Sequence, residues 1–310
     1  MQRWRGVDAI PSWWGRSVVT IGVFDGMHRG HAQLVSHAVA RARELGVPCV
    51  LMTFDPHPSE VVRPGSHPAQ LTSLRRRAEL AERLGVDVFF VLPFTVELSR
   101  MPADEFVHEL LVERLHAAVV VVGRNFTFGH KAAGNVTLLG VLGRRFGFTA
   151  HDVGLVSQGE LTFSSTYIRS CIDAGDVAAA STALGRSHRV EGIVIRGDQR
   201  GRGLGYPTAN LSTPRYAAIP ADGVYACRFV HRGRALAAAV SVGTNPTFSG
   251  RERRVEAFVL DIDEDFYGEQ VALDFVERLR PMVRFDTPDQ LVAQIDDDVA
   301  RTREVLARTG

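Results

Sequence analysis

The stretch SVVTIGVFDGMHRGH, residues 17–31, decides how the first half of this chain folds. Its first eight residues form an almost unbroken apolar run, which predicts a strand that is covered on both faces. Gly26 and Gly30 then allow a tight turn, and a helical pattern of apolar residues begins at His31. The stretch therefore predicts a buried strand, a turn and the N-terminus of a helix in direct succession.

The same alternation of apolar runs and helical patterns continues to about residue 156. The apolar runs are residues 17–24, 48–54, 86–94, 116–123 and 148–156. The helical patterns between them are residues 31–45, 73–84, 103–115 and 135–145. Strands that alternate with helices in this way predict an α/β fold with a doubly wound parallel sheet.

After about residue 186 the pattern changes to strand-like runs that follow one another mostly without helices. These runs are residues 187–195, 223–230, 234–243, 254–262 and 270–280. A helical pattern over residues 288–308 closes the chain. We therefore expect two domains, residues 1–186 with the parallel sheet and residues 187–310 with a small antiparallel β-barrel and a terminal helix.

Composition excludes several classes of protein. The 310 residues include 36 Lys or Arg and 35 Asp or Glu, so the formal net charge of +1 provides no basic field for nucleic acid. No segment has the ~18 apolar residues of a membrane span, and the N-terminus lacks the apolar core of a signal peptide. Three widely spaced cysteines, Cys49, Cys171 and Cys227, indicate a reduced, cytoplasmic protein. The sequence leaves the oligomeric state open.

Four unusual polar clusters follow predicted strands of the first half. They are FDGMHRGH (24–31), FDPHP (54–58), GRNFTFGH (123–130) and SSTYIR (164–169). Open parallel sheets bind ligands beyond the carboxyl ends of their strands, and all four clusters are expected at that edge. A Walker-type phosphate loop is absent, because no GxxxxGK precedes a Ser or Thr.

His28 and His31 are three residues apart, so we expect them on one face of the first helical turn. A helix N-terminus already favours phosphate through its free N–H groups and its dipole. Two imidazoles there can donate hydrogen bonds to phosphoryl oxygens as charge develops. The alternative is a capping turn with surface histidines, and Ser164 or Ser165 could likewise simply cap a helix.

FDGMHRGH resembles the HxGH signature of the nucleotidyltransferase superfamily, which transfers a nucleotidyl group from ATP or CTP. SSTYIR resembles the second phosphate-binding element of that superfamily. The resemblance implies catalytic roles for His28, His31 and Arg169. It also implies that a set of residues binds ATP, namely Gly22, Phe24, Asp25, Gly30, Ser164, Ser165 and Thr166.

TFDPHP and GRNFTFG narrow the resemblance to the flavin adenylyltransferase branch, the N-terminal module of bacterial bifunctional riboflavin kinase/FAD synthetases. The resemblance implies a catalytic role for Asn125, where the family more often has Asp. It also implies a set of flavin-binding residues, Phe54, Asp55, Pro56, His57 and Phe128. The two phenylalanines could equally be core residues, which is the usual place of Phe.

GDQRGRGLGYPTANL, residues 197–211, resembles the riboflavin kinase signature. The glycines alone would fit a flexible loop, but in an extended segment Thr208 and Asn210 would point the same way. Their side-chain oxygens suit magnesium, and the resemblance implies that they hold Mg²⁺. It further implies that the loop binds ATP through Gly201, Arg202, Gly203, Gly205 and Pro207.

RVEAFVLD, residues 254–261, places Glu256 in an otherwise apolar run. Such a residue could simply face solvent, but the resemblance assigns the catalytic carboxylate to it. The nucleophile of a riboflavin kinase is a neutral hydroxyl, so a positioned base is useful. The segment SVGTNPTF, residues 241–248, also resembles a family segment near the active site.

The resemblance implies a bifunctional enzyme that uses ATP and Mg²⁺. Residues 187–310 would phosphorylate riboflavin to FMN, and residues 1–186 would adenylylate FMN to FAD and release pyrophosphate. The partners are then small molecules, with no nucleic acid and no membrane. The alternatives are a nucleotidyltransferase for another phosphate acceptor and a flavin- or nucleotide-sensing protein without turnover.

Overall fold

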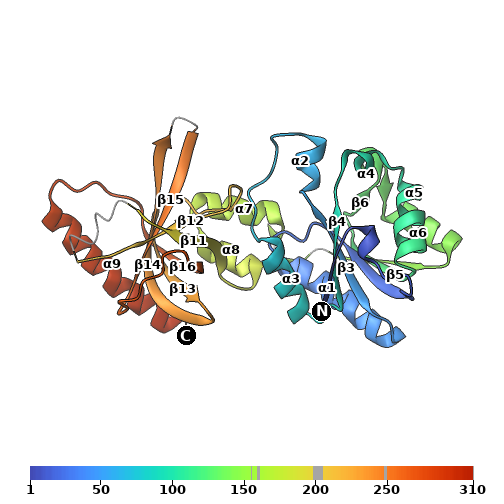
Figure 1. Cartoon of the computed structure of the whole chain (residues 1–310), viewed down its shortest axis with the longest axis horizontal. Coiled ribbons are helices and arrows are strands. Elements are labelled where there is room, and N and C mark those ends of the chain that lie inside the picture. The colour runs from blue at the N-terminus through green and yellow to red at the C-terminus, as the bar shows by residue number, and fades with distance from the viewer. Residues whose placement is uncertain (155, 159–160, 198–204, 248–249, 310) are drawn as a thin grey trace. The chain divides into compact units, whose positions relative to one another are not determined.

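The computed structural model describes residues 1–154, 156–158, 161–197, 205–247 and 250–309 (Figure 1). The chain forms two compact units. The N-terminal unit comprises Met1–Pro68 and Ser73–Ser164, and the C-terminal unit comprises Ala69–Thr72 and the residues from Ser165 onward. These units divide the chain elsewhere than at residues 186 and 187, so the division into two catalytic domains at that point stays a prediction.

The N-terminal unit contains a six-stranded sheet in the order β1-β4-β3-β2-β5-β8. The strands are β1 (Gln2–Arg5), β2 (Ser17–Ile21), β3 (Cys49–Asp55), β4 (Val88–Pro93), β5 (Ala117–Gly123) and β8 (Thr149–Val153). Every neighbouring pair is parallel, which confirms the predicted fold class. All carboxyl ends of these strands therefore lie at one edge of the sheet.

Both faces of this sheet are buried, which explains the continuous apolar runs. Along β5, Val119 and Val121 join one hydrophobic cluster and Val120 and Val122 join the other. One cluster is covered by α1 (Arg29–Leu45) and α3 (Leu74–Arg83). The other is covered by α5 (Ala103–Phe106), its π-helical continuation η2 (Val107–Arg114), and α6 (Val136–Phe146).

The order of the strands reverses at β2, which lies between β3 and β5. Successive crossovers place β3 and β4 on one side of β2 and β5 and β8 on the other. Such a reversal separates the connections above the two central strands and opens a crevice there. The segment of residues 22–31 leaves the sheet at this point.

Several short elements were not predicted from the sequence. The edge strand β1 buries only Trp4, so its alternation is too short to recognise. The other short elements of the N-terminal unit are η1 (Val7–Ala9), α2 (Pro58–Val62), α4 (Val96–Arg100), β6 (Thr127–Phe128), η3 (His130–Ala132), β7 (Gly134–Asn135), β9 (Ser157–Gln158) and β10 (Leu161–Thr162).

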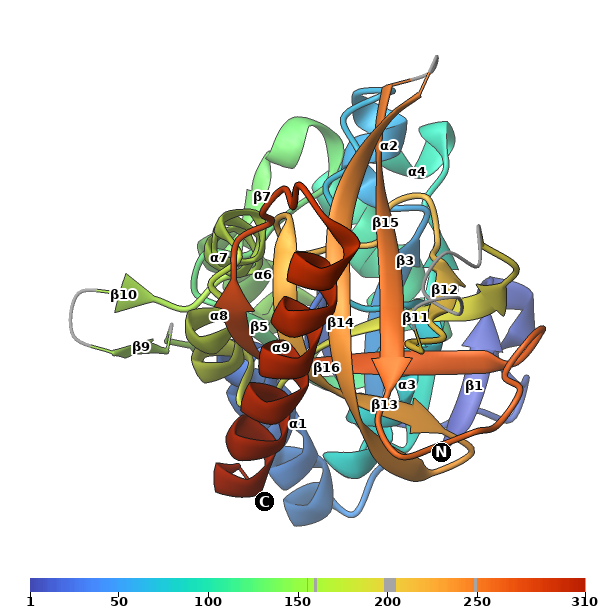
Figure 2. The ribbon, with the colours of Figure 1, turned by 90° about the vertical axis from the view of Figure 1, so that its left-hand side faces the viewer.

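The C-terminal unit contains a closed antiparallel barrel in the order β11-β12-β15-β14-β13-β16, as predicted (Figure 2). Its strands are β11 (His188–Ile195), β12 (Ala209–Ser212), β13 (Gly223–His231), β14 (Arg234–Thr247), β15 (Gly250–Val259) and β16 (Gln270–Arg280). Only β12 was not predicted as a strand. Its four residues are too few to show a clear alternation.

Three helices accompany the barrel: α7 (Ser165–Ala174), α8 (Val177–Leu184) and α9 (Pro288–Arg308). Helix α9 packs on β13, β14 and β16 (Figure 2). A nearly buried ion pair joins it to the barrel, with 2.7 Å between Arg280 Nη2 and Asp298 Oδ2.

Segment Ala69–Thr72 crosses from the sheet-containing part of the chain into the C-terminal unit. The Gln70 amide donates to the Tyr216 carbonyl (2.5 Å), and the Ala218 amide donates to the Gln70 carbonyl (2.9 Å). The carbonyl of Ala69 accepts a hydrogen bond from Arg169 Nε at 2.6 Å. A short piece of early sequence is therefore held by backbone bonds in the later unit.

Candidate active sites

The turn between β2 and α1 departs from ordinary backbone geometry. Phe24, Gly26 and Met27 have positive φ angles of 52°, 83° and 39°. Positive φ is uncommon for residues with a side chain, and it often marks functional sites. The turn is also buried, since Phe24, Asp25 and Met27 are each at most 3% exposed. This segment is therefore a fixed feature of the protein core rather than a surface loop.

The two histidines of the turn lie together. His28 is the N-cap of α1, and its Nδ1 accepts a hydrogen bond from the His31 backbone amide (3.3 Å). The two imidazole rings stack with centroids 3.7 Å apart, and the His31 ring meets Phe24 edge-on at 5.3 Å. Because Nδ1 of His28 is an acceptor, the neutral ring carries its proton on Nε2.

His31 is held in its neutral form. Burial, the neighbouring His28 and the Arg77 guanidinium lower the pKa of His31 well below its usual value. Within the described part of the chain, its Nδ1 atom is buried and has no hydrogen-bond partner. The helix thus begins with two stacked imidazoles, one of which has an unused polar atom.

Gly30 makes room for this arrangement. A Cβ atom at this position would lie 3.1 Å from Cε1 and 3.2 Å from Nδ1 of the His28 ring. Gly22 has a similar role at the end of β2, because a Cβ there would lie 3.2 Å from the ring of Phe24. Close packing against a neighbouring ring therefore explains why glycine occupies both positions, which the motif resemblance alone does not.

The predicted residues after β5 belong to two environments. Asn125 is exposed, and its Oδ1 atom lies over Gly123, where a Cβ would be only 3.2 Å away. Phe128 is buried in the core and stacks on Phe126 at 5.4 Å. The core position of Phe128 matches the alternative noted from the sequence, and its contact with flavin remains a prediction.

The predicted residues after β3 form a more open group. Phe54 packs edge-on against Phe94 at 5.6 Å, and Asp55 pairs with Arg5 at 2.8 Å. The bond between Asp55 and Pro56 is cis. His57 caps α2, with its Nδ1 accepting from the Ser59 amide at 3.1 Å. Parallel pairing places this group at the same sheet edge as the histidine turn.

The SSTYIR segment spans the division between the compact units. Ser164 belongs to the N-terminal unit, whereas Ser165, Thr166 and Arg169 belong to the C-terminal unit. Phe163, one residue earlier, lies against the histidine turn, with its ring 5.4 Å from the Arg29 guanidinium. That the hydroxyls and Arg169 face one triphosphate remains a prediction.

Arg77 is the residue near this site that the sequence analysis missed. It is only 3% exposed, and its Nη1 donates to the Val23 carbonyl at 2.9 Å. Arg75, Arg76 and Arg77 look like a solvated helix face in the sequence. However, Arg77 is three residues after Leu74 and four before Ala81, which places it on the apolar face of α3.

In the barrel, strand register brings Glu256 directly opposite Asn210 on β12 and Ser241 on β14. The neighbours Val255 and Ala257 are buried, so Glu256 points to the opposite, outer face of the strand. Directly opposed residues have Cβ atoms roughly 4.5–5.5 Å apart. The predicted base and one predicted metal ligand therefore lie side by side.

Asn210 lies close to the start of the glycine loop. A Cβ atom at Gly197 would overlap the Asn210 side-chain amide. Gly201, Arg202 and Gly203 of the predicted ATP loop lie outside the described residues. Gly205, where the description resumes, has a positive φ of 87°.

Tyr206 joins the end of the loop to the terminal helix. Its hydroxyl donates to Asp296 Oδ1 at 2.5 Å, and this hydrogen bond raises the pKa of the tyrosine. Its ring meets Phe258 edge-on at 5.3 Å. The segment that precedes Pro207 and Thr208 is thereby fixed at two points.

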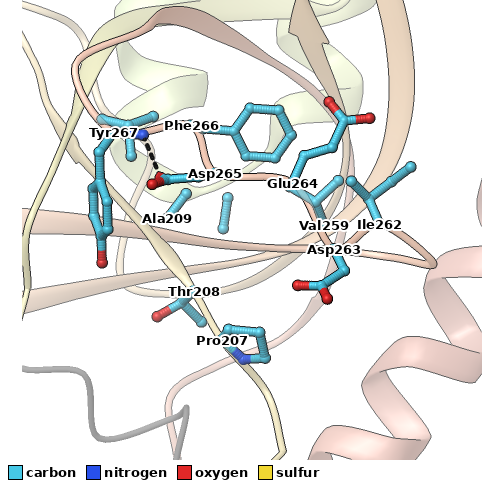
Figure 3. A pocket seen from close by; sticks show the side chains of 12 residues that line it. Pro207, Thr208, Ala209, Val259, Ile262, Asp263, Glu264, Asp265, Phe266 and Tyr267 are labelled. Carbon is cyan, nitrogen blue, oxygen red and sulfur yellow. Dashed lines mark hydrogen bonds between the residues drawn. The ribbon is translucent and has the colours of Figure 1, made fainter.

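A pocket of about 240 Å³ lies beside Thr208 (Figure 3). Pro207 and Thr208 form one wall, and the loop of residues 262–267 forms another (Figure 3). That loop carries Asp263, Glu264 and Asp265, and the Asp265 carboxylate accepts from the Tyr267 amide at 2.9 Å. Of the other two carboxylates, Glu264 pairs with Arg234 at 3.0 Å, and within the described residues no three His, Cys, Asp or Glu side chains gather as a metal site.

The segment of residues 241–248 contains a structural anchor. The hydroxyl and amide of Thr244 donate to the two carboxylate oxygens of Asp222, at 2.7 and 3.1 Å. Ser241 faces Glu256 across the strand pair. One observation therefore supports the resemblance of this segment to an active-site segment: Ser241 lies in the same cross-strand row as Glu256 and Asn210.

Comparison with known proteins decides the family. The family model for FAD synthetase matches residues 10–167, and the family model for riboflavin kinase matches residues 184–306. The bifunctional riboflavin kinase/FMN adenylyltransferase of Escherichia coli strain K12 is 33% identical over 293 residues, covering 94% of this chain and 93% of the relative. The chain belongs to this bifunctional family.

Other family members and a solved structure agree over nearly the full length. The Pseudomonas fluorescens enzyme of the same description is 35% identical over 308 residues, covering 99% of this chain and 98% of that protein. A Streptococcus pneumoniae crystal structure, described as a macrolide-efflux protein, has a TM-score of 0.89 and 33% identity, covering 98% of this chain and 99% of that one. Among the helices in the described ranges, none is long and apolar enough to cross a membrane.

The chain is therefore an enzyme with two activities. It phosphorylates riboflavin to FMN with ATP, and it adenylylates FMN to FAD. The expected bifunctional activity is confirmed. The family matches do not support the two alternatives, a transferase for another phosphate acceptor and a sensor without turnover.

Proposed function

We propose that the two reactions use two separate groups of residues, one at the edge of the parallel sheet and one on the barrel. The stacked pair of His28 and His31 supports the first assignment. The cross-strand row of Asn210, Glu256 and Ser241 supports the second. The domain division at residues 186 and 187 and a cytoplasmic location belong to the same proposal.

In adenylyl transfer, a phosphate oxygen of FMN attacks the α-phosphorus of ATP, and the bond to pyrophosphate breaks. The attacking phosphate is already mostly ionised near neutral pH, since its second pKa is ~6. A general base is therefore unnecessary, and the enzyme has to hold two anions together and stabilise the spreading charge. His28 donates from Nε2, and the α1 N-terminus adds backbone N–H groups.

The other predicted residues of this site fit supporting roles. Asp25, Gly22, Gly30 and Phe24 shape the turn against which the triphosphate lies. Asn125 offers a polar group at the end of β5, and Ser164, Ser165, Thr166 and Arg169 offer hydroxyls and a cation to the β- and γ-phosphates. The flavin would lie beyond β3, beside Phe54, Asp55, Pro56 and His57, with Phe128 supporting it from the core.

In phosphoryl transfer, the 5′-hydroxyl of riboflavin attacks the γ-phosphorus of a second ATP, and ADP leaves. Glu256 accepts the hydroxyl proton as the oxygen–phosphorus bond forms. The ATP phosphates are proposed to lie beside Thr208, held by Gly201, Arg202, Gly203, Gly205 and Pro207 of the glycine loop.

The donor set of this site fits magnesium. Thr208 and Asn210 offer neutral oxygen ligands, and Asp263 lies on the opposite wall of the pocket beside Thr208. Mg²⁺ prefers oxygen ligands and commonly keeps water and substrate phosphate in its coordination sphere. When bound, it would neutralise charge on the ATP phosphates.

Magnesium titration of FMN formation tests the metal assignment. In Asn210→Ala, we expect the Mg²⁺ concentration for half-maximal FMN formation to rise by about tenfold or more, because one oxygen ligand is lost. Ser212→Ala, two residues along the same strand, is the matched control and should keep the wild-type midpoint. Equal midpoints in both variants would remove Asn210 from the metal site.

A further inference from the structure

Arg77 occupies an unusual place for a charged residue. Its neighbours Arg75 and Arg76 both pair with Glu79 on the same helix, at 3.1 and 2.9 Å. Arg77 instead extends toward the sheet, where its Nη1 lies 2.9 Å from the Val23 carbonyl and 3.5 Å from Thr53 Oγ1. Burial of a guanidinium costs free energy unless hydrogen bonds or opposite charges compensate for it. Arg77 is only 3% exposed, so its buried position suggests a specific role.

The first consequence is positional. The Val23 carbonyl accepts from both Arg77 Nη1 and Thr53 Oγ1, the latter at 3.0 Å. Two donors use both lone pairs of this oxygen and fix the peptide that joins Val23 to Phe24. Phe24, with its positive φ, follows immediately, so the turn that carries His28 starts from a clamped peptide.

The second consequence is electrostatic. Two titratable or charged neighbours affect His31, namely His28 from the same turn and Arg77 from α3. The carboxyl group of Asp25 is also buried in this turn. Burial of the ring lowers the pKa of His31 most, and His28 and the buried Arg77 guanidinium add to the decrease. The guanidinium therefore adds a fixed positive charge behind the imidazole pair.

We propose that Arg77 is a positioning residue for adenylyl transfer, which fixes the Val23–Met27 turn and places a buried positive charge behind the two histidines. It acts through the turn and through His31, without touching ATP or FMN. The inference rests on the proposed role of the histidine pair.

The test uses the full chain with FMN, ATP and Mg²⁺. In Arg77→Met, we expect kcat/KM for FAD formation to fall by about 10- to 100-fold, while FMN formation from riboflavin stays within about twofold of wild type. The His31 ring proton signal in NMR, assigned with His31→Gln, should titrate at a higher pH, because removal of the cation raises the pKa.

Two further variants separate the positional and electrostatic parts. Arg77→Lys keeps the charge, so His31 should titrate as in the wild type even where the rate falls. Thr53→Val removes the second donor to the Val23 carbonyl and the long 3.5 Å contact with Arg77, but it keeps the guanidinium and its charge. It should lower the rate of FAD formation without moving the His31 titration, and it remains informative if Arg77→Met fails to fold.

Arg76→Met is the matched control. Arg76 is 7% exposed and is the adjacent residue of the same helix, but it pairs with Glu79 rather than with the turn. FAD formation and the His31 titration should both be nearly unchanged. If Arg76→Met and Arg77→Met lower the rate equally and neither moves the His31 titration, Arg77 is only a packing residue.

Failure of this inference is distinguishable from failure of the proposed function. Full FAD formation in the double variant His28→Ala/His31→Ala would remove the histidine pair from the mechanism whatever Arg77 does. Loss of activity in His28→Ala combined with wild-type rate and titration in Arg77→Met would overturn the role of Arg77 alone.

Discussion

The candidate adenylyl-transfer site and the candidate kinase site differ in how the chain builds them. The centre of the first is one continuous stretch, from the end of β2 into the first turn of α1, with its histidines three residues apart. The second joins residues from β12, β14 and β15, which meet only through strand pairing. One site depends on local backbone geometry, and the other depends on register.

The difference in the residues of the two sites matches the difference in charge between the two nucleophiles. An FMN phosphate needs no base, so a helix N-terminus and two imidazoles are suitable groups. A ribityl hydroxyl has to lose a proton, so the barrel site has a carboxylate beside oxygen ligands. The two sites are therefore expected to respond to opposite sets of substitutions.

The largest effect is expected for Glu256→Gln. Loss of the base should lower kcat for FMN formation by about 10²–10⁴-fold, while conversion of supplied FMN to FAD stays nearly intact. Chromatographic resolution of riboflavin, FMN and FAD measures both reactions in one sample. Glu277→Gln, a carboxylate on β16 that pairs with Arg308, is the control and should retain both activities. Equal loss of both reactions in Glu256→Gln would contradict separate sites.

The reverse pattern, with a somewhat smaller effect, is expected for His28→Ala and for His31→Ala. Each should reduce FAD formation by about 10²–10³-fold, because a donor to the developing charge is lost. FMN formation from riboflavin should continue. His37→Ala, on the exposed side of the same helix, is the control. A double variant of His28 and His31 that still makes FAD at the wild-type rate would exclude both residues.

The smallest effects, about tenfold, are expected from two glycine substitutions that move side chains without removing them. Gly30→Ala should displace the His28 ring and slow only FAD formation. Gly197→Ala should displace the Asn210 amide and slow only FMN formation. Gly15→Ala is the control, because a Cβ at Gly15 would have no neighbour within 4 Å. If either glycine variant slowed the other reaction, or slowed both reactions equally, the two sites would not be independent.

Much of the fold could be predicted because its strands have long, clear patterns. Five strands of the parallel sheet and the main helices follow from apolar runs and helical spacing. The exceptions are short. β1 buries one side chain and β12 has four residues, so neither gives a period that can be distinguished from a loop.

The candidate sites follow the same division. The proximity of His28 and His31 could be predicted, since their separation in sequence fixes it. The stacking of their rings depends on His28 acting as the N-cap, one residue before the helix. The pairing of Glu256 with Asn210 could not be predicted, because barrel closure sets the register between distant strands. Motif resemblance had connected these two residues without giving their geometry.

Segment Ala69–Thr72 has a practical consequence for dissecting the enzyme. A cut between residues 186 and 187 would leave α7, α8 and the Gln70 backbone bonds without the barrel unit to which they belong. We therefore expect that expression of the two halves as separate polypeptides would not give two intact folding units. Point variants in the uncut enzyme are the better instrument for assigning each reaction to its residues.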